Sequence, residues 1–534
     1  MSIEMNPERR LTGLDFILIR GAEIHPDRLA IDDRLTGLTL TYEQLRSRSA
    51  KLAHGFQSLG IKKGDRIAYA NYNDHASVEI IFAGMMAGAV MVPLNTRLTQ
   101  AEAQPFMDAQ DCLIFIGHTD FSYMAEKSRV AHIILRGQGT SRTEGSTDYE
   151  ELIASHPDTP LVPQVRWEDP WALGMTGGTT GGAKAVVWTH GGFLLDIPTV
   201  MVHQGLQRYD TTISFAPTYH IAGLGFVVLP ILWLSGTVIF PPTPSFDPQF
   251  LHEELKNRSL DYIFFVPAMV EPLYAAWGGE PLTNLRAASL ASAPTFEPQR
   301  LKLREMFPET RLITAYGMTE TFSITSQSPE DFLTFADGVG EPQLGARVRI
   351  VNDEGRTLPR GEVGHIVART VAMGIYHQDP DNTRKSFKKL ADDPEGLDWI
   401  YTGDVGLMDD LGRVKIVDRS KDVIITGGEN VNSVEVEAIL SSHPLVKECA
   451  VVGRNDVKWG EAITAVIVKS DADKDDRELC RELLKLCRAK IAGYKIPKII
   501  AFVDALPRSH FGKILKRDLR TADLPNFINS AELK

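Results

Sequence analysis

Two patterns of apolar residues alternate along the chain up to Gly338. Stretches 45–59 and 78–88 place apolar residues at helical spacing, and short apolar runs typical of buried strands lie between such stretches. The predicted strands are 65–70, 90–94, 112–116, 131–135, 212–216, 262–266 and 311–315. Because helices that alternate with strands act as crossover connections, the pattern predicts a largely parallel sheet covered on both faces. The large body of the protein is therefore expected to have an α/β fold.

The pattern changes after Gly338, where short strands separated by turns begin. Strands are expected at 348–351 and 364–368. Charged residues cluster near position 420, and helical and strand patterns mix again beyond them. We therefore predict an N-terminal domain of residues 1–419, which contains a β-rich subdomain over about 338–419, and a C-terminal domain of residues 420–534.

One apolar run raises the question of a membrane span. Residues 221–240 carry no charge, and a stretch of ~20 apolar residues is long enough to cross a bilayer. However, Gly223, Gly225, Pro230 and Gly236 interrupt it, no basic flank follows, and its end resembles a strand. We expect a buried helix that leads into a buried strand, and no stable membrane insertion.

Charge and cysteine usage narrow the class of protein further. The net charge of −12 argues against nucleic acid as a partner, because polyanion binding selects for clustered positive charge. Cys112, Cys449, Cys480 and Cys487 show no CxxC spacing and no histidines in metal-ligand register, so buried thiols are expected. The first residues lack the pattern of a signal peptide, and a reducing cytoplasm is the expected compartment.

The stretch Met175–Lys184 has the composition of a phosphate-binding loop. Glycines allow the backbone N–H groups to approach an anion, threonine hydroxyls add donors, and the lysine supplies a positive charge. The alternative is a flexible glycine-rich turn, because a glycine-rich motif on its own is a weak signal.

Several later segments also have the composition of ligand loops. Residues 315–321 follow a buried strand, and open α/β sheets bind ligands at the carboxyl ends of their strands. There Tyr316 is suited to stack on a base and Glu320 to bind a divalent cation, although an ordinary strand–helix connection is the alternative. Asp404 offers a carboxylate for ribose hydroxyls, and Lys513 lies in a glycine-containing segment near the C-terminus.

Together and in this order, these segments resemble the adenylate-forming enzymes, the superfamily of acyl-CoA synthetases, luciferases and peptide-synthetase adenylation domains. The resemblance extends from about Leu14 to about Arg520. It implies a large N-terminal domain of two doubly wound α/β subdomains plus the small β-rich subdomain, and a mobile, small α+β C-terminal domain. It also implies an ATP-dependent ligase that uses Mg²⁺ and coenzyme A.

The resemblance assigns roles residue by residue. In the family, the aromatic residue packs on adenine, the threonine contacts the α-phosphate, and an aspartate and an arginine contact the ribose. The nucleotide-binding residues are then Thr176, Gly178, Thr179, Thr180, Gly181, Lys184, Ser292, Ala293, Ala315, Tyr316, Gly317, Met318, Thr319, Asp404, Arg419 and Lys513. The expected catalytic residues are Lys513, Glu320, Thr180 and His220, with Glu320 and Thr180 as the Mg²⁺ ligands.

The resemblance further implies motion of the C-terminal domain. The hinge maps to Lys421, and a channel for a thiol maps to Gly427, Gly428 and Trp459. A short charged linker can absorb the required change in backbone dihedrals.

Four positions depart from the family pattern. Relatives often have serine where this chain has Gly177, proline at Ala183, glycine at Ala185 and serine at Phe511. These changes affect the phosphate loop and the segment of Lys513 without removing a proposed catalytic group. A binding-only homologue is the alternative that they raise.

The acid substrate is expected to be apolar. Segment 217–223 resembles the part of acyl- and aryl-CoA ligases whose aromatic or histidine residue gates the acyl pocket, and His220 is the candidate gate; a packed core histidine is the alternative. The expected pocket residues are Tyr219, His220, Gly223, Leu290, Ala291 and Phe265. No charged group is available there, and an unpaired polar tail would cost ~1–3 kcal/mol, which favours a medium-chain fatty, aryl or alicyclic acid.

The acceptor and the assembly stay open. CoA is the expected acceptor, and a stand-alone enzyme that loads a carrier protein is the alternative. A homodimer is compatible with this interpretation.

Overall fold

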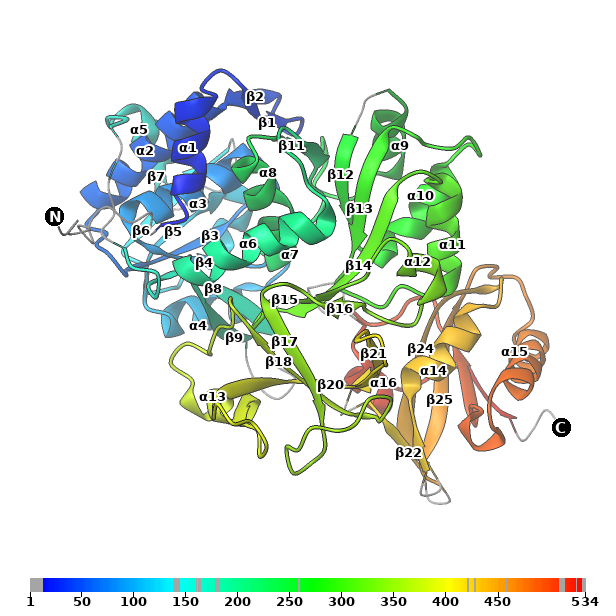
Figure 1. The fold of residues 1–534 in the computed structure, drawn as a ribbon. Coiled ribbons are helices and arrows are strands. Elements are labelled where there is room, and N and C mark those ends of the chain that lie inside the picture. The colour runs from blue at the N-terminus through cyan, green and yellow to red at the C-terminus, as the bar shows by residue number, and fades with distance from the viewer. Residues whose placement is uncertain are drawn as a thin grey trace.

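The computed structural model describes residues 13–137, 145–159, 161, 165–177, 183–257, 260–419, 422–426, 429–456, 459–508, 514–524 and 526–530. In this part of the chain the strands form four sheets (Figure 1). The two larger sheets are mainly parallel, the third is antiparallel and the fourth is mixed. The predicted α/β class of the large body is therefore confirmed.

The first large sheet carries the loops that bind ligands in open α/β folds. Its order is β16–β15–β14–β13–β12–β10–β11–β1–β2; the strands from β14 to β1 are parallel to one another, and β15, β16 and β2 are added antiparallel at the two ends. Its strands are β1 (Leu29–Asp33), β2 (Leu38–Thr41), β10 (Thr211–Ile213), β11 (Thr237–Phe240), β12 (Leu260–Phe265), β13 (Leu285–Leu290), β14 (Arg311–Met318), β15 (Phe322–Ser326) and β16 (Glu341–Pro342).

The second large sheet ends in an antiparallel hairpin. Its order is β7–β6–β5–β3–β4–β8–β9, and β9 is antiparallel to β8. Its strands are β3 (Arg66–Ala70), β4 (Val90–Pro93), β5 (Cys112–His118), β6 (His132–Arg136), β7 (Thr147–Asp148), β8 (Pro170–Gly177) and β9 (Ala183–Thr189).

A central apolar core joins one face of each large sheet. Helix α3 is buried at every position, as expected for a helix that is apolar all round and lies between two sheets. The helices that contribute to this core are α1 (Phe16–Ile24), α2 (Tyr42–Ser58), α3 (His75–Ala87), α5 (Tyr149–Ala154), α6 (His190–Gln204), α7 (Ile221–Gly223), the π-helix η3 (Leu224–Val228) and α8 (Leu229–Trp233).

Separate outer cores cover the other faces of the two sheets. On the first sheet this layer contains α9 (Pro248–Asn257), η4 (Pro267–Met269), α10 (Val270–Ala276), α11 (Glu297–Met306) and α12 (Asp331–Thr334), the green helices beside β12 to β14 in Figure 1. On the second sheet it contains α4 (Gln100–Ala109) and η2 (Thr119–Met124). Both large sheets are therefore covered on both faces, as the resemblance implied.

The β-rich subdomain has an antiparallel sheet of order β17–β18–β20–β19, with β21 paired to β20. Trp399 is fully buried in its small core. The elements are β17 (Ala346–Val351), β18 (Gly364–Thr370), α13 (Pro380–Ser386), β19 (Phe387–Lys389), β20 (Asp398–Met408) and β21 (Val414–Arg419).

The C-terminal unit has a mixed sheet of its own. Its order is β23–β22–β25–β26–β27, with β24 paired to β25. Cys480 and Cys487 share the buried face of its long helix α15, and all four cysteines are buried free thiols, as predicted. The elements are β22 (Ile424–Thr426), β23 (Glu429–Val431), α14 (Ser433–Ser441), β24 (Val446–Asp456), β25 (Gly460–Lys469), α15 (Asp476–Lys490), η5 (Gly493–Lys495), β26 (Ile499–Phe502), α16 (Lys516–Thr521) and β27 (Phe527–Asn529).

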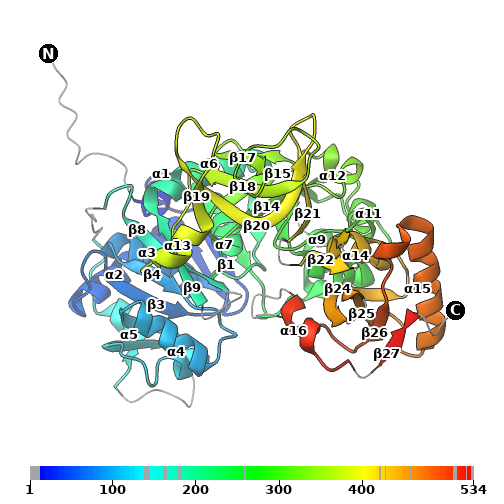
Figure 2. The same ribbon diagram turned by 90° about the horizontal axis from the view of Figure 1, so that it is seen from below.

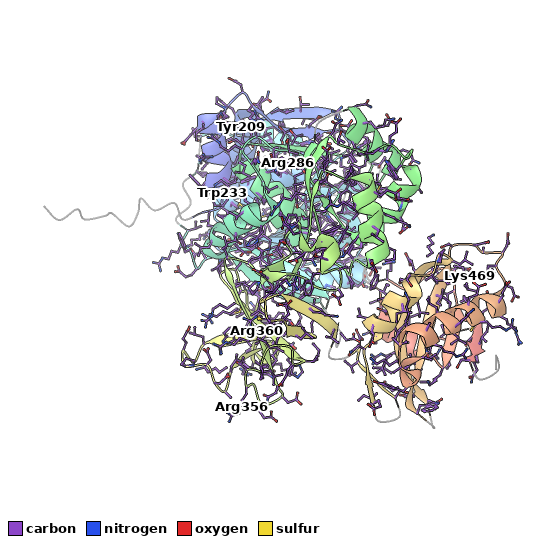
Figure 3. All side chains as sticks on the ribbon, turned by 45° about the vertical axis from the view of Figure 1, so that its right-hand side comes forward. Tyr209, Trp233, Arg286, Arg356, Arg360 and Lys469 are labelled. Carbon is purple, nitrogen blue, oxygen red and sulfur yellow. The ribbon has the colours of Figure 1, made fainter. Side chains whose placement is uncertain are left out.

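We propose a domain boundary near residue 420. The sheet of the β-rich subdomain ends with β21, and the next strand, β22, belongs to the C-terminal sheet. Figure 2 shows the blue subdomain of the second sheet and the orange-to-red C-terminal unit on opposite sides of the molecule. In Figure 3, Lys469 of this unit is set apart from Arg286 of the large body and from Arg360 of the β-rich subdomain.

The apolar run 221–240 forms α7, η3 and α8 and then continues into the buried strand β11. This confirms the prediction of a buried helix that leads into a strand. Within the described residues, no helix is both long enough and apolar enough to cross a membrane.

Asp196 is a buried carboxyl group within α6. Its Oδ1 accepts a hydrogen bond from the Thr199 hydroxyl at 3.4 Å, and its Oδ2 is buried without a partner among the described residues. Burial raises the pKa of Asp196 to about 7. The neutral carboxyl therefore fits this position better than the carboxylate.

Replacing Asp196 with asparagine should stabilise the protein in a pH-dependent way. Because the folded-state pKa lies above the unfolded value, the stability that the neutral acid contributes is present below about pH 4 and is lost as pH rises through about 7. We expect Asp196→Asn to raise the melting temperature by several degrees near pH 8 and by little near pH 5. Asp410→Asn, at an exposed turn, is the control, and an equal shift at both pH values would contradict the argument.

Candidate active site

The phosphate loop is carried by the β8–β9 hairpin. The last two pairs of the hairpin are Thr176 with Lys184 and Gly177 with Ala183, so the two predicted phosphate contacts Thr176 and Lys184 lie opposite each other. The loop residues Gly178, Thr179, Thr180 and Gly181 lie outside the described residues. The sheet register therefore fixes where this loop leaves the sheet and returns to it.

A buried indole ties the hairpin to the next candidate loop. Trp188 lies on β9, and its Nε1–H donates to the carbonyl oxygen of Thr319 at 2.9 Å. Thr319 is the predicted α-phosphate contact, and it is half-buried. The hydrogen bond joins two segments that are 131 residues apart in sequence, and it holds the turn after β14 beside the phosphate hairpin.

The predicted adenine and ribose contacts meet each other directly. The hydroxyl of Tyr316, on β14, donates to Oδ2 of Asp404, on β20, at 2.5 Å. Asp404 is largely buried, and its Cα pairs with that of Arg419 across β20 and β21. The backbone thus places Arg419 beside the two other candidates, while its side chain lies outside the described residues.

The turn between β14 and β15 is sharp and strained. A Cβ on Gly317 would lie 1.9 Å from the carbonyl oxygen of Phe322, so only glycine allows this close approach. Phe322 itself has φ +63°, a left-handed conformation that costs energy for a bulky residue. Strain of this kind is common at ligand sites, and here it fixes the backbone on either side of Glu320.

The remaining nucleotide candidates lie at the carboxyl ends of β13 and β14. Ser292 and Ala293 are exposed directly after β13, and Ser292 has φ +77°. Ala315 is buried and Met318 is half-buried on β14. The two strands are parallel neighbours, so these residues share one edge of the sheet.

Glu320 is a buried carboxylate whose partner the sequence did not reveal. The hydroxyl of Tyr376 donates to its Oε1 at 2.6 Å. The ring of Tyr376 also lies 4.8 Å from Nζ of Lys184. Tyr376 was not predicted because it lies 56 residues from Glu320 in an irregular segment, and nothing in its neighbours indicates a ligand site.

The donor set around Glu320 fits Mg²⁺. Within the described residues, no group of three or more His, Cys, Asp or Glu side chains forms a metal cage. Mg²⁺ usually takes one or two carboxylates and completes its coordination with water and substrate phosphates. A single buried carboxylate beside the phosphate hairpin meets that requirement, with Glu320 and Thr180 as the proposed ligands.

His220, the predicted gate of the acyl pocket, lies directly before helix α7. Nδ1 of His220 accepts a hydrogen bond from the backbone N–H of Ala222 at 3.2 Å, which caps α7. A Cβ on Gly223, the last residue of α7, would lie 2.2 Å from the carbonyl oxygen of Pro217, so the helix can pack against the turn before it only with glycine at this position. Burial raises the pKa of the half-buried Tyr219. The π-helix that follows is a feature found frequently at functional sites.

Two predicted pocket residues face away from this segment. Phe265 and Leu290 pack in the outer core with α9 to α11, because side chains alternate along a strand. Phe264, one residue earlier on β12, faces the central core, and its ring lies 5.6 Å from that of Phe226 on η3. Ala291 also packs against the central core. We therefore replace Phe265 and Leu290 by Phe264 in the proposed acyl pocket.

Of the C-terminal candidates, the structure describes Trp459. Lys421, Gly427, Gly428 and Lys513 lie outside the described residues. Trp459 is half-buried, and Nζ of Lys498 lies 5.3 Å from the centre of its ring.

The segment that contains Lys513 is closed at its base. Arg508 and Ile514 form an antiparallel bridge, and the Leu515 N–H donates to the Pro507 carbonyl at 2.8 Å. Lys516 then binds Oγ of Ser433 at 2.6 Å and Oε1 of Glu437 at 2.7 Å, both on α14.

This anchor continues into the β-rich subdomain. Backbone N–H and side-chain Oγ of Ser433 both donate to the carboxylate of Asp418, which lies on β21 next to Arg419. Asp418 pairs with Val405, the neighbour of Asp404 on β20. A chain of hydrogen bonds therefore leads from the Lys513 segment to the strand pair of the proposed ribose site.

Comparison with known proteins identifies the family. The AMP-binding enzyme family model matches residues 18–376, and the AMP-binding enzyme C-terminal domain matches residues 435–513. The chain belongs to the AMP-binding enzymes.

Individual relatives match the chain along nearly its whole length. A feruloyl-CoA synthase from Amycolatopsis sp. is 34% identical over 515 residues, which cover 96% of this chain and 99% of that protein. A 2-succinylbenzoate–CoA ligase from Bacillus cereus is 30% identical over 509 residues, covering 94% and 97%. The solved structure of the anthranilate CoA ligase AuaEII in complex with anthranoyl-AMP has a TM-score of 0.86 at 25% identity and covers 98% of each chain.

Proposed function

We propose that this protein joins an aryl carboxylic acid to CoA through an acyl-adenylate. The chain is an AMP-forming acid–thiol ligase that uses ATP, Mg²⁺ and CoA. In the first half-reaction a carboxylate oxygen attacks the α-phosphorus of ATP, and pyrophosphate leaves. In the second, the CoA thiolate attacks the acyl carbon of the adenylate, and AMP leaves.

We assign the nucleoside to the edge of the sheet at β14 and β20. The ring of Tyr316 offers a face for adenine, and Asp404 offers a carboxylate for the ribose hydroxyls. The hydrogen bond between these two side chains, at 2.5 Å, supports the assignment because it holds both on one side of the site. Thr319 follows on the same turn and is assigned to the α-phosphate.

The phosphates need positive charge, and two lysines are assigned to supply it. Lys184 lies at the base of the phosphate loop, and Lys513 lies in the C-terminal segment. Fixed charges near the reacting phosphorus stabilise the transition state without reorganisation of solvent. Mg²⁺, when held by Glu320 and Thr180, supplies further charge that stabilises the leaving pyrophosphate.

The proposal of an aryl acid rests on the aromatic side chains that lie near the His220 segment. Phe226 on η3 packs against Phe264 and Phe322, with ring centres 5.6 Å and 5.1 Å away. A Cβ on Gly225 would lie 2.3 Å from the ring of Phe322, so this position leaves room for the aromatic side chain. Aromatic side chains favour a flat aryl group through edge-to-face contacts. The feruloyl-CoA and 2-succinylbenzoate–CoA relatives support the same class of acid.

A screen of carboxylic acids tests this proposal. CoA-dependent AMP release would be measured for benzoates, cinnamates, alicyclic acids and linear fatty acids of graded length, with mass detection of the thioester. We expect kcat/KM to be highest for an aryl acid and about 10-fold or more lower for linear acids of similar volume. Equal rates across the panel, or a maximum for linear acids, would contradict the aryl pocket.

The acceptor is tested by the same product analysis. Thioester formation with free CoA is expected, whereas transfer to a carrier protein and not to CoA would favour the carrier-loading alternative. The departures at Gly177, Ala183 and Phe511 raise a weakened, binding-only homologue as the other alternative. AMP release with any acid of the panel would exclude it.

We also propose a reducing, cytoplasmic compartment, which the four buried free thiols support. A homodimer stays a prediction that sedimentation velocity would test.

A further inference from the structure

A short segment after β18 joins two parts of the proposed nucleotide site. The Gly374 N–H donates to the carbonyl oxygen of Glu320 at 2.8 Å. The Val187 N–H of β9 donates to the carbonyl oxygen of Ile375 at 2.9 Å, and the His377 N–H donates to the carbonyl oxygen of Ala185 at 2.7 Å. Residues 374–377 therefore lie between the Glu320 turn and strand β9, which carries Lys184.

Tyr376 is the side chain that this segment directs at Glu320. It pairs with Val186 of β9 in an antiparallel bridge, so its backbone position is fixed by the phosphate hairpin. Its hydroxyl donates to Oε1 of Glu320 at 2.6 Å, and both side chains are buried, at 7% and 5% exposure. Burial and the adjacent carboxylate raise the pKa of Tyr376, so the hydroxyl keeps the proton that it donates.

The ring of the same tyrosine contacts the lysine of the phosphate hairpin. Nζ of Lys184 lies 4.8 Å from the ring centre, a distance at which the ring face attracts an ammonium group. Hydrogen bonds from Asn382 lower the pKa of the Asp379 carboxyl, and the positive charge of nearby Lys184 lowers it further. One residue thus contacts a proposed Mg²⁺ ligand through its hydroxyl and a proposed phosphate ligand through its ring.

We propose that Tyr376 is a positioning residue that holds the side chains of the Mg²⁺ ligand Glu320 and the phosphate ligand Lys184 in fixed positions relative to each other. The inference rests on the proposed roles of those two residues. Within the described residues, the hydroxyl of Tyr376 makes the hydrogen bond that Glu320 accepts, so it determines how the carboxylate is oriented. Partners of this kind hold a metal ligand in its binding orientation, and their loss typically weakens metal affinity ~10–100-fold.

Two substitutions separate the contributions of the hydroxyl and the ring. Tyr376→Phe removes the hydroxyl and keeps the ring under Lys184. We expect it to weaken Mn²⁺ binding about 10-fold or more, measured by electron paramagnetic resonance on the full chain with a non-hydrolysable ATP analogue. KM for the carboxylic acid should not change, which would distinguish positioning from general damage to the fold. Tyr376→Leu should additionally weaken binding of the analogue in the absence of metal.

The chain offers a matched control for these variants. Tyr274 donates its hydroxyl to Glu305 at 2.8 Å, and Nζ of Lys302 lies 5.1 Å from its ring, but this trio is on the outer helices α10 and α11. Tyr274→Phe should leave Mn²⁺ affinity unchanged. If Tyr376→Phe also leaves it unchanged, the proposal is overturned.

A double-substitution cycle separates this inference from the role of Glu320. Tyr376→Phe in the Glu320→Gln background should have no further effect on Mn²⁺ affinity, because the two residues act together. If the two substitutions weaken Mn²⁺ binding additively, the proposed coupling is overturned, even if Tyr376→Phe alone weakens Mn²⁺ binding. Normal Mn²⁺ affinity in Glu320→Gln alone would instead contradict the metal role of Glu320 and with it the basis of the proposal.

Discussion

Lys513→Ala is expected to reduce the adenylation half-reaction by about 10²-fold or more, while thioester formation from a supplied acyl-adenylate continues at close to its normal rate. Lys513 is assigned to the charge that develops when pyrophosphate leaves, and that charge does not arise in the thiol step. Pyrophosphate exchange measures the first step. Reaction of synthetic acyl-AMP with CoA measures the second.

The anchoring of its segment supports this expectation. Lys513 lies outside the described residues, but the bridge between Arg508 and Ile514 closes the segment, and Lys516 ties its end to α14. Asp418 connects α14 to β21 and so to the proposed ribose site. A lysine on a segment with a fixed base can be presented to the α-phosphate with little loss of side-chain and backbone entropy.

Lys490→Ala is the control, because Lys490 is an exposed residue in the last turn of α15. It should leave both half-reactions unchanged. Normal pyrophosphate exchange by Lys513→Ala would show that the role assigned to this lysine is wrong. A parallel loss in both half-reactions would point to a defect of folding and not of adenylation.

The alternation of apolar patterns was sufficient to predict the class of fold. The expected helix 78–88 corresponds to α3, and the expected strands 262–266 and 311–315 correspond to β12 and β14. These elements are long or strongly apolar, and the prediction of each one depends only on the local periodicity of its apolar residues. Such patterns can be recognised without knowing which elements pack against them, because burial on both faces selects continuous apolar runs.

The orientation of single side chains could not be predicted in the same way. Phe264 and Phe265 are equally apolar, and both lie on β12, which is buried on both faces. Nothing in the sequence indicates which of them faces α7 and η3 and which faces α10. The structure places Phe264 on the first side and Phe265 on the second. A strand with one polar face would have revealed the register, whereas a fully buried strand does not.

The contacts within the site were hidden for a different reason. Tyr316 reaches Asp404 across 88 residues, and Tyr376 reaches Glu320 across 56. Each pair depends on how the β-rich subdomain packs on the first sheet, which local patterns do not encode. The motif residues at the ends of strands were identifiable because strand ends and glycine-rich loops have local signatures, but Tyr376 lies in an irregular segment without one.

Glu320→Gln is expected to lower the adenylation rate by about 10²-fold and to raise the Mg²⁺ concentration needed for half-maximal activity. Glutamine has nearly the same shape, and its amide oxygen can still accept the hydrogen bond that Tyr376 donates at 2.6 Å. The substitution therefore removes the negative charge and keeps the packing. The loss then measures what the charge contributes to holding the cation beside the phosphates.

The strained turn between β14 and β15 makes the result of Glu320→Gln easier to interpret. Glu320 lies between Gly317, which has no room for a Cβ, and Phe322, whose φ is +63°. Such a backbone leaves the side chain at position 320 little freedom to move toward another ligand site. Glu341→Gln, at an exposed position on β16, is the control that changes net charge equally. If Glu320→Gln and Glu341→Gln show the same Mg²⁺ dependence, the buried carboxylate serves the structure of the turn, through Tyr376 and Gly374, and the cation is held elsewhere.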